Sequence, residues 1–511
     1  MTTITKHAKC TRWAVLALAI LLCAGLFAGC KRQEQENPTG TNPSDSTGGT
    51  TDTGDSLYDE DGYLKDHLDP DLDFKGETFD ILGWNSGYDS DFYVELSSGD
   101  TVSDAVYSRN LVVQDRMKVT LKTNFIDGNN ATQGEWVATA MQSVYGGSKY
   151  DMFGCYSMCA GTLYVQGGIQ SLSALPHLDF EMPWWSASLI EMSELNGELY
   201  FLTGDLSNAF LYNLYFLIYN KDMVAAEALD DPRQLVLDGT WTNEAMMEMT
   251  RGIWVDNDGV PGLTTGDRVG FASYGEVHMD CFLAATGIPM AAENSEGVFE
   301  LTEEFTGNTV QELIETLNEW LWDSGDCLYR VTSGDTAYNT IKSGYALFGA
   351  VAGSTIKAFR DENWEYGVLP YPKLNARQES YYTNLGFAYS NFCVPLNAAA
   401  PDMSAAVLEC MASESYRSSA PTLFEDCMKS RWSAGDEVDS QMFDIIKGNI
   451  YVDVNRVFSS RFTWRQGSIA LFRYSLTDND DNWISKIEGE REYINGILAD
   501  IAQPEIQPEA E

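Results

Sequence analysis

Positive charge and histidine are scarce in this sequence. Its 511 residues include 32 Lys and Arg against 76 Asp and Glu, which gives a formal net charge of −44, and they include only four His. Proteins that bind nucleic acid neutralise phosphates with Lys and Arg, so this charge excludes nucleic acid as a partner. Long-range repulsion also disfavours anionic ligands, although one well-placed Arg could offset it locally.

The motifs of common catalytic and metal sites are missing too. The chain has no Gly-x-Ser-x-Gly elbow, no Walker loop and no His-Glu-x-x-His motif. Acidic residues are too numerous for the sequence to single out the carboxylate pair of a glycosidase. Asp256 to Gly259 and Asp478 to Asp481 resemble calcium loops, but the later bidentate Glu is absent at the required spacing. We therefore expect no catalytic residue, metal ion or cofactor, while calcium binding by an acidic loop stays open.

Cysteines are few and are not arranged as zinc ligands. Of the ten, Cys10, Cys23 and Cys30 lie near the N-terminus. The other seven are Cys155, Cys159, Cys281, Cys327, Cys393, Cys410 and Cys427. An odd number cannot all pair within one chain, and no two doublets have zinc-site spacing. We expect mainly buried free thiols, and the sequence does not identify partners for any disulfide.

Long apolar runs are confined to the N-terminus. Basic residues up to Arg12 precede the uncharged run Trp13 to Ala28, a pattern typical of a secretory signal peptide. The run is shorter than the roughly 20 residues that a membrane-spanning helix needs. Leu26-Phe27-Ala28-Gly29-Cys30 resembles a bacterial lipobox, in which Cys30 is acylated and becomes the first mature residue. Residues 31–56 are rich in Gly, Ser, Thr, Asn, Asp and Pro and cannot form a core.

These features predict a lipoprotein signal peptide at 1–29 and a lipidated Cys with a disordered tether at 30–56. The protein would then be anchored at the extracellular face of the cell membrane. The roughly 455 residues that follow exceed a single core, which favours two lobes.

The first part of this region alternates between strand and helix patterns. Strands are predicted at 79–84, 118–123 and 150–155. The helices between them are predicted to begin with capping boxes at Thr101 and Thr132. Such an order implies parallel strands joined by right-handed crossovers. Further along, 210–219 reads as a buried strand, and 309–322 as an amphipathic helix.

Four passages resemble family 1 of the bacterial extracellular solute-binding proteins, which includes maltodextrin-binding proteins. They are 150–153 with 167–169, 217–222 with 239–242, 343–349 with 366–370, and 386–395 with 405–408. The resemblance implies a periplasmic-binding-protein-like type II α/β fold, with a hinge and a ligand cleft between two lobes. It places the N-terminal lobe at 75–216 plus 395–455, and the C-terminal lobe at 220–388 plus 456–511.

The same resemblance implies a monomeric, non-enzymatic receptor of an ABC importer. It would capture a small polar solute, a mono- or oligosaccharide, and deliver it to permease subunits. A receptor for a peptide or another polar solute, a non-transport binding lipoprotein and a surface glycoside hydrolase are the alternatives. Several sugar-binding relatives place a Trp in the cleft shortly after the segment that corresponds to Phe348-Gly349. Ala350-Val351 stand here, which weakens a maltodextrin-like interpretation.

Candidate ligand-binding residues follow the predicted strands, because ligands of open α/β sheets lie beyond the carboxyl ends of strands. This rule selects loops near the first and third strands, before the first crossing between lobes, and after the strand at 269–272. The candidates are Trp84, Asn85, Asp89, Tyr156, Asp205 and Tyr274, with Glu276 near Tyr274 and Trp464 as a weaker candidate. Trp84 offers a stacking face, and Asn85 and Asp205 offer acceptors. Core packing is the competing interpretation for the aromatic residues.

Overall fold

The computed structural model describes residues 57–88, 90–147, 149–329, 334–433 and 435–502. The predicted signal peptide, Cys30 and the tether lie outside the described residues, as do Asp89 and 503–511. The chain from Leu57 onward forms one unit, and the account below concerns that unit.

The first lobe is built on a four-stranded sheet with the order β12-β3-β1-β2. The strands are β1 (Glu77–Trp84), β2 (Val119–Ile126), β3 (Met152–Tyr156) and β12 (Ser390–Cys393). Strand β1 is parallel to β2 and β3, and β12 is antiparallel to β3. The predicted parallel arrangement is therefore confirmed.

Alternate residues of β1 are buried on opposite faces of this sheet. Phe79 and Ile81 belong to the core beneath α2 (Thr101–Met117) and α14 (Pro401–Arg417), while Leu82 and Trp84 belong to the core beneath α3 (Gln133–Tyr145) and α4 (Ser157–Val165). This division follows the two-residue period of a strand. Both faces are covered by helices, so the carboxyl edge of the sheet is left for a binding site.

The two predicted capping boxes of this lobe are wrong in detail. The N-cap of α2 is Asp100, whose carboxylate accepts from the amides of Val102 and Ser103. The carboxylate of Asp104 is occupied elsewhere, because it accepts from the loop that precedes the helix. Thr132 precedes α3 but makes no capping hydrogen bond.

The second lobe is built on a five-stranded mixed sheet with the order β10-β4-β9-β5-β8. The strands are β4 (Tyr215–Asn220), β5 (Val269–Ala272), β8 (Cys327–Leu328), β9 (Ala346–Ala352) and β10 (Tyr366–Leu369). Strand β5 is parallel to β8 and β9, whereas β4 is antiparallel to β9 and β10. The strand predicted at 210–219 begins only at Tyr215, because α6 (Asn208–Tyr212) occupies its first part.

Helices and short strands complete the second lobe. They are α7 (Lys221–Ala226), α8 (Pro232–Leu237), α9 (Asn243–Thr250), α10 (Val277–Ala284), β6 (Ala291–Glu293), β7 (Phe299–Leu301), α11 (Glu303–Thr306), α12 (Asn308–Asn318), η1 (Glu319–Asp323), α13 (Gly334–Lys342), η2 (Gly353–Phe359), α18 (Ser468–Thr477) and α19 (Trp483–Ala502). The amphipathic pattern predicted for 309–322 is confirmed, since Val310, Leu313, Ile314 and Leu317 of α12 are buried.

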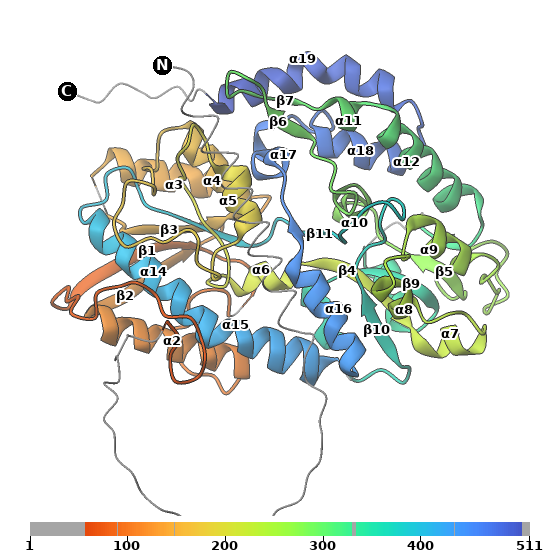
Figure 1. Ribbon diagram of the computed structural model, residues 1–511, viewed down its shortest axis with the longest axis horizontal. Coiled ribbons are helices and arrows are strands. Elements are labelled where there is room, and N and C mark those ends of the chain that lie inside the picture. The colour runs from red at the N-terminus through yellow and green to blue at the C-terminus, as the bar shows by residue number, and fades with distance from the viewer. Residues whose placement is uncertain (1–56, 89, 148, 330–333, 434, 503–511) are drawn as a thin grey trace, which may run out of the picture. The chain divides into compact units, whose positions relative to one another are not determined.

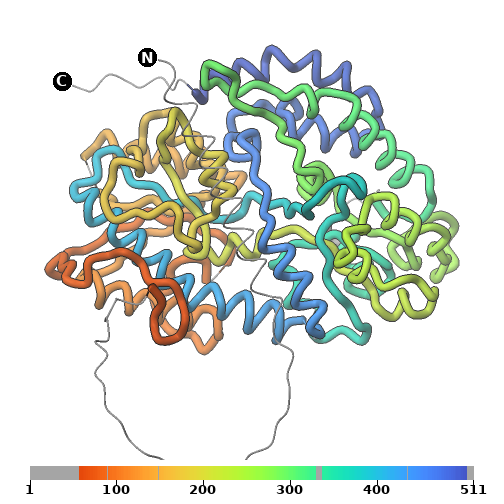
Figure 2. Tube along the Cα trace, in the orientation of Figure 1, coloured from red at the N-terminus to blue at the C-terminus, as the bar shows by residue number. Residues whose placement is uncertain are grey.

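The remaining elements belong to neither of the two large sheets. They are α5 (Ala187–Ser193), α6, β11 (Thr383–Asn384), α15 (Ser419–Pro421), η3 (Thr422–Trp432), α16 (Glu437–Gly448), β13 (Ile450–Tyr451), α17 (Val454–Val457) and η4 (Ser459–Arg461). Figure 2 shows the trace in red to yellow around the first sheet, in green to teal around the second, and in blue back through both.

Helix α16 lies on the second lobe, although 395–455 was expected in the first. It contacts β10 and α8. Asp439 of α16 accepts from Lys221 at 2.5 Å and from Arg233 at 3.1 Å, and Asp436 accepts from Arg233 at 2.9 Å. These charges attach the helix to the second lobe.

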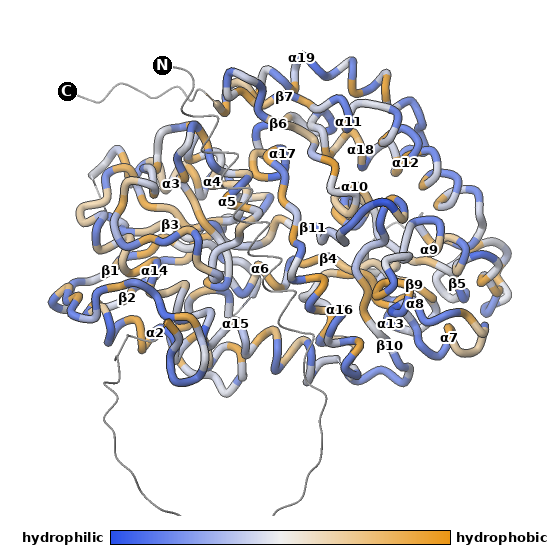
Figure 3. Tube along the Cα trace, in the orientation of Figure 1, coloured by the Kyte–Doolittle hydropathy of each residue, from blue (hydrophilic) through white to orange (hydrophobic). Residues whose placement is uncertain are grey.

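Apolar residues are concentrated on the central strands, as Figure 3 shows, and one core cluster continues from the first sheet to the second. The seven cysteines after Cys30 are buried and unpaired. Within the described part of the chain, no helix combines the length and hydrophobicity needed to cross a membrane.

Candidate functional site

A cavity of 500 Å³ lies between the two sheets, where strands from both lobes end. Tyr156 at the end of β3 and Glu276 after β5 face it from the two lobes. Asn213 and Phe387 reach it from two of the crossings, and Trp464 from the loop before α18. The position agrees with the rule that ligands of α/β sheets lie beyond the carboxyl ends of strands.

Phe387 is held at the cavity by a buried arginine. The guanidinium carbon of Arg456 lies 4.0 Å from the centre of the Phe387 ring. Arg456 Nε donates to the carbonyl of Leu385 at 2.5 Å, which fixes the crossing that carries Phe387. Its Nη1 donates to Asp280 at 3.2 Å. A cation over an aromatic face is attractive, so the orientation of this ring is set by charge as well as by packing.

Charged groups form the wall contributed by the second lobe. Arg473 Nη1 contacts Glu276 at 3.3 Å, and Arg473 also donates twice to Asp280, at 2.8 and 2.6 Å. Burial lowers the pKa of Arg473, but the Asp280 carboxylate raises it by more, so that the pKa lies above its ordinary range. The guanidinium is therefore always charged, and the half-exposed Glu276 carboxylate is kept beside it.

Glu276 has an unusual backbone conformation. Its φ is 61° and its ψ is −138°, in a region that side chains rarely adopt. Strain of this kind persists where the surroundings hold it, and it gathers at binding sites. Arg465, which also lines the cavity, has φ 68°.

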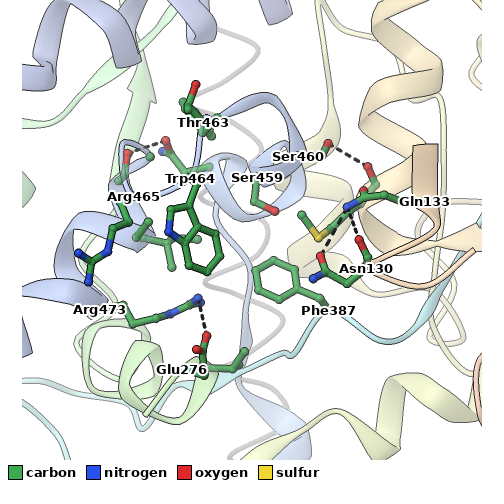
Figure 4. Close-up of a pocket in the computed structure, with 18 of the residues that line it drawn as sticks. Asn130, Gln133, Glu276, Phe387, Ser459, Ser460, Thr463, Trp464, Arg465 and Arg473 are labelled. Carbon is green, nitrogen blue, oxygen red and sulfur yellow. Dashed lines mark hydrogen bonds and ion pairs between the residues drawn. The ribbon is translucent and has the colours of Figure 1, made fainter. Parts of the chain in front are cut away.

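Trp464 offers a free aromatic face at the mouth of the cavity. Its side chain is 72% exposed, which is uncommon for Trp, and its ring centre lies 5.6 Å from that of Tyr474. The guanidinium carbon of Arg465 lies 3.8 Å from the centre of the Tyr474 ring. Thr463 is anchored by two 2.8 Å contacts with the hydroxyl of Tyr493. Figure 4 shows the indole of Trp464 facing the cavity, with Phe387 across from it.

Amide groups face the cavity from the first lobe and from a crossing. Gln133 donates to the carbonyl and side chain of Asn130, so both amides lie on one wall (Figure 4). Asn213 Nδ2 contacts the carbonyls of Ala209 and Ala388 at 2.8 and 2.7 Å. Amides supply donors and acceptors together, which is what a polyhydroxylated ligand needs.

His278, close to the cavity, is uncharged at neutral pH. Burial lowers its pKa to about 4, and its ring lies edge-on to Tyr215, 5.1 Å between centres. This histidine is therefore expected to stay uncharged above about pH 5.

Of the six residues predicted to bind ligand, Tyr156 lines the cavity. Trp84 is 1% exposed, donates to Ser390 Oγ at 2.8 Å, and lies 5.0 Å from Tyr156, so it supports that residue from the core. Asn85 points to Asp127 at 2.7 Å, and Asp89 lies outside the described residues.

The other two candidates lie elsewhere. Asp205 is buried 3.6 Å from Lys447 in a separate small pocket, and burial raises the pKa of its carboxyl group. Tyr274 is not among the lining residues, whereas Glu276, two positions later, is. Sequence reasoning missed Asn213, Phe387 and Arg473. Asn213 and Phe387 could have been found from their position in the predicted crossings, because segments that connect two lobes border the cleft between them.

Three acidic side chains approach one another in the predicted acidic turn. Oxygens of Asp256, Asp258 and Asp267 lie within 4.8 Å of each other. Asp267 is already satisfied, since it accepts from the amides of Asn257 and Thr264 at 3.1 and 2.8 Å. Asp256 and Asp258 are exposed, as expected for a solvated turn.

No protein-family model and no curated protein sequence matches this chain. Solved structures do match this chain. A cyclic α-maltosyl-1,6-maltose binding protein from Arthrobacter globiformis is 12% identical, covers 83% of this chain and 100% of its own, and has a TM-score of 0.56. An ABC substrate-binding protein from Listeria monocytogenes, in complex with cycloalternan, is 11% identical over 83% and 99% of the two chains, with a TM-score of 0.52.

A family 1 extracellular solute-binding protein from Bifidobacterium longum subsp. infantis is 12% identical over 82% of this chain and 100% of its own, with a TM-score of 0.52. At these identities the similarity concerns the fold. The expected type II arrangement of two α/β lobes is thereby confirmed.

Proposed function

We propose that this chain, which has the fold of extracellular solute-binding proteins, is the receptor of an ABC importer and captures a carbohydrate in the cavity between its lobes. The observation that carries the proposal is the lining of that cavity. It combines aromatic rings, amides and an ion-paired carboxylate, drawn from both lobes and from the crossings. Two of the structural neighbours are described by the oligosaccharides they bind, which supports the same ligand class.

Sugars present apolar C–H faces and a periphery of hydroxyl groups. Trp464 and Phe387 offer rings for the faces, and Glu276 and Arg473 offer an acceptor and a donor for the hydroxyls. A solute that touches both lobes favours the closed arrangement, because its contacts are complete only there. Binding of this kind requires no chemical step, so the solute is released unchanged.

Anchoring at the extracellular face of the membrane belongs to the same proposal. The lipobox-like sequence before Cys30 and the polar stretch up to Ser56 support a diacylglycerol anchor with a flexible tether. Replacing Cys30 with Ala should release the protein from the membrane fraction of the producing cell. Permease subunits are the expected partners, and the receptor itself is expected to be monomeric.

The test is calorimetric titration of the purified protein with mono- and oligosaccharides, followed by chromatography of the recovered sugar. We expect saturable binding and recovery of intact sugar. Trp464→Ala should weaken binding by about tenfold, which is the equivalent of about 1.4 kcal/mol. Trp254→Ala is the matched control, because Trp254 is an exposed tryptophan outside the cavity lining. Binding of peptides but no saccharide, or release of shortened sugars, would contradict the proposal.

A further inference from the structure

The small pocket that contains Asp205 is a cavity of 170 Å³, bordered by α5, α6 and the end of α16 (Figure 1). Its lining shares no residue with the cavity of the proposed solute site. A water molecule takes up about 30 Å³ of the liquid, so this space corresponds to a ligand of roughly five or six non-hydrogen atoms. Such a ligand is smaller than a single sugar ring with its hydroxyl groups.

The carboxylate in this cavity has few partners. The side chain of Asp205 is 10% exposed, and its ion-pair partner is Lys447, with Oδ1 and Nζ 3.6 Å apart. That distance exceeds a hydrogen bond, and no other side chain in the described part of the chain donates to this carboxylate. A buried carboxylate without donors is costly, so hydrogen bonds from a ligand would stabilise it.

Hydrogen-bond donors line the same cavity. Trp184 is fully buried, and its Nε1 has no hydrogen-bond partner among the residues that the structure describes. The hydroxyls of Ser186 and Ser188 each accept from a backbone amide, which leaves their own hydrogens to donate. Donors of this kind suit the oxygens of a ligand carboxylate.

The cavity therefore offers one negative and one positive charge. Asp205 repels an anion, and Lys447 repels a cation, whereas a zwitterion can be attracted by both. In an α-amino acid the ammonium nitrogen and the carboxylate carbon are two bonds, and about 2.5 Å, apart. Its two charges can thus lie antiparallel to those of Asp205 and Lys447, each beside a charge of opposite sign.

We propose that this cavity is a second binding site, which takes a small α-amino acid such as glycine, alanine or serine in its zwitterionic form. Asp205 binds the ammonium group of the ligand. Lys447, with the donors of Trp184 and Ser188, binds its carboxylate. The inference goes beyond the proposed function and does not depend on it.

A ligand at this site contacts both lobes. Asp205 belongs to the first lobe and precedes the first crossing, while Lys447 belongs to α16, which ion pairs attach to the second lobe. A bound amino acid connects the two and leaves the first cavity free. This is the position of a regulatory ligand rather than of a transported one.

Calorimetric titration of the purified protein at neutral pH tests the inference. The probes are glycine and L-alanine, compared with acetate and methylammonium, each of which is glycine without one of its charged groups. We expect saturable binding of the two amino acids. Acetate and methylammonium should bind at least about tenfold more weakly, because each leaves one charge of the cavity unmatched.

Two variants each remove one charge of the cavity. Asp205→Asn and Lys447→Gln should each weaken the binding of L-alanine by about tenfold or more. Lys122→Gln is the control, because Lys122 pairs with Asp80 on the surface of the first lobe and its side chain is 67% exposed. It should bind L-alanine as the wild type does.

Asp205 is buried, so a third variant guards against a folding defect. Ala187→Trp fills the cavity from an exposed position of α5 and should abolish the binding of L-alanine without changing either charge. Ala225→Trp, at an exposed position of α7, is its control and should leave binding unchanged. Thermal melting verifies that each variant is folded.

Several outcomes would overturn the inference. They are the absence of binding by every small amino acid, equal binding of glycine, acetate and methylammonium, and L-alanine binding that survives both Asp205→Asn and Ala187→Trp. Loss of L-alanine binding in Trp464→Ala but not in Asp205→Asn would overturn it as well, because the ligand would then lie in the first cavity. Saccharide binding is measured separately, so failure of this inference leaves the proposed function intact.

Discussion

Asp280 is a buried carboxylate that serves two arginines at the cavity. It is 3% exposed and contacts Arg456 at 3.2 Å and Arg473 at 2.6 Å. The first arginine holds the crossing that carries Phe387, and the second holds Glu276. Asp280 is therefore a positioning residue, which sets two walls of the cavity without lining it.

Replacing Asp280 with Asn should leave two guanidinium groups short of negative charge in a buried place. Removing one partner of a buried ion pair costs about 3–5 kcal/mol. We expect the free energy of unfolding, measured by urea denaturation, to fall by about that amount, and saccharide affinity to fall as well. Asp478→Asn is the control, because Asp478 pairs with Arg465 where both side chains are 46% exposed. Its effect should stay below about 1 kcal/mol. Equal effects of the two variants would contradict this role.

Glu409 of α14 makes the stability of the first lobe depend on pH. Burial raises the pKa of its carboxyl group to about 8, and a 3.1 Å hydrogen bond from Trp185 Nε1 offsets only part of that rise. The folded protein therefore holds this proton more tightly than the unfolded chain. The resulting stabilisation is complete below the ordinary pKa of Glu and is lost as pH rises toward 8.

The expected change in the free energy of unfolding between pH 5 and pH 8 is a loss of a few kcal/mol, since each pKa unit corresponds to about 1.4 kcal/mol. Urea denaturation at a series of pH values measures it. Glu409→Gln keeps the shape of the side chain without the ionisable proton, so its stability should vary less over the same range. A variant with the same slope as wild type would show that other groups produce the pH dependence.

Some residues that line the cavity could be predicted from the sequence and others could not, and individual residues show why. The carboxyl-end rule selected Tyr156 and Trp84 alike. Whether a side chain at a strand end faces solvent or the core depends on the helices above it, and α3 and α4 cover Trp84. Phe387 and Arg473 enter the cavity from segments distant in sequence, so their proximity becomes visible only once the chain is folded.

At the scale of elements, periodicity predicted more than local signals did. The buried face of α12 and the order of β1, α2, β2, α3 and β3 follow from apolar spacing. The first residue of α2 could not be predicted in this way, because Asp100 and Thr101 are both residues that favour the N-cap position. Asp104 makes its hydrogen bonds with the preceding loop, and Asp100 is the residue that caps the helix. The strand predicted at 210–219 failed at its first residues because a continuous apolar run suits a buried helix as well as a strand.

Helix α16 shows why lobe boundaries are difficult to read from sequence. Its buried face, with Met442, Phe443 and Ile446, indicates only that the helix packs on a core, and nothing local indicates that the segment returns to the second sheet. Its position depends on Lys221 and Arg233, which precede it by about 200 residues and supply the charges opposite Asp436 and Asp439. A contact of this range leaves no periodic signal in the sequence.

At the scale of the molecule, the crossings govern how the lobes can move. The chain passes between the sheets at Leu214, at 385–389 and at 452–458, and all three segments adjoin the first cavity or its supports. Small backbone rotations in such short segments are enough for hinge closure. The cavity between the lobes and the crossings therefore share residues, and binding of a ligand there should be coupled to closure.

Small-angle scattering measures that coupling. We expect the radius of gyration of the purified protein to fall when a saccharide that binds is added at a saturating concentration. A solute that contacts Tyr156 and Glu276 bridges the two lobes. The double variant Glu276→Ala, Trp464→Ala should keep the radius of the free protein at the same sugar concentration, since both changes remove contacts of the second lobe.

At a sugar concentration of 100 times Kd, the wild type should also gain about 2.7 kcal/mol of stability, whether or not it closes. A stability gain without contraction would mean that the free protein is already closed, and that the solute enters through a local opening rather than by movement of the lobes.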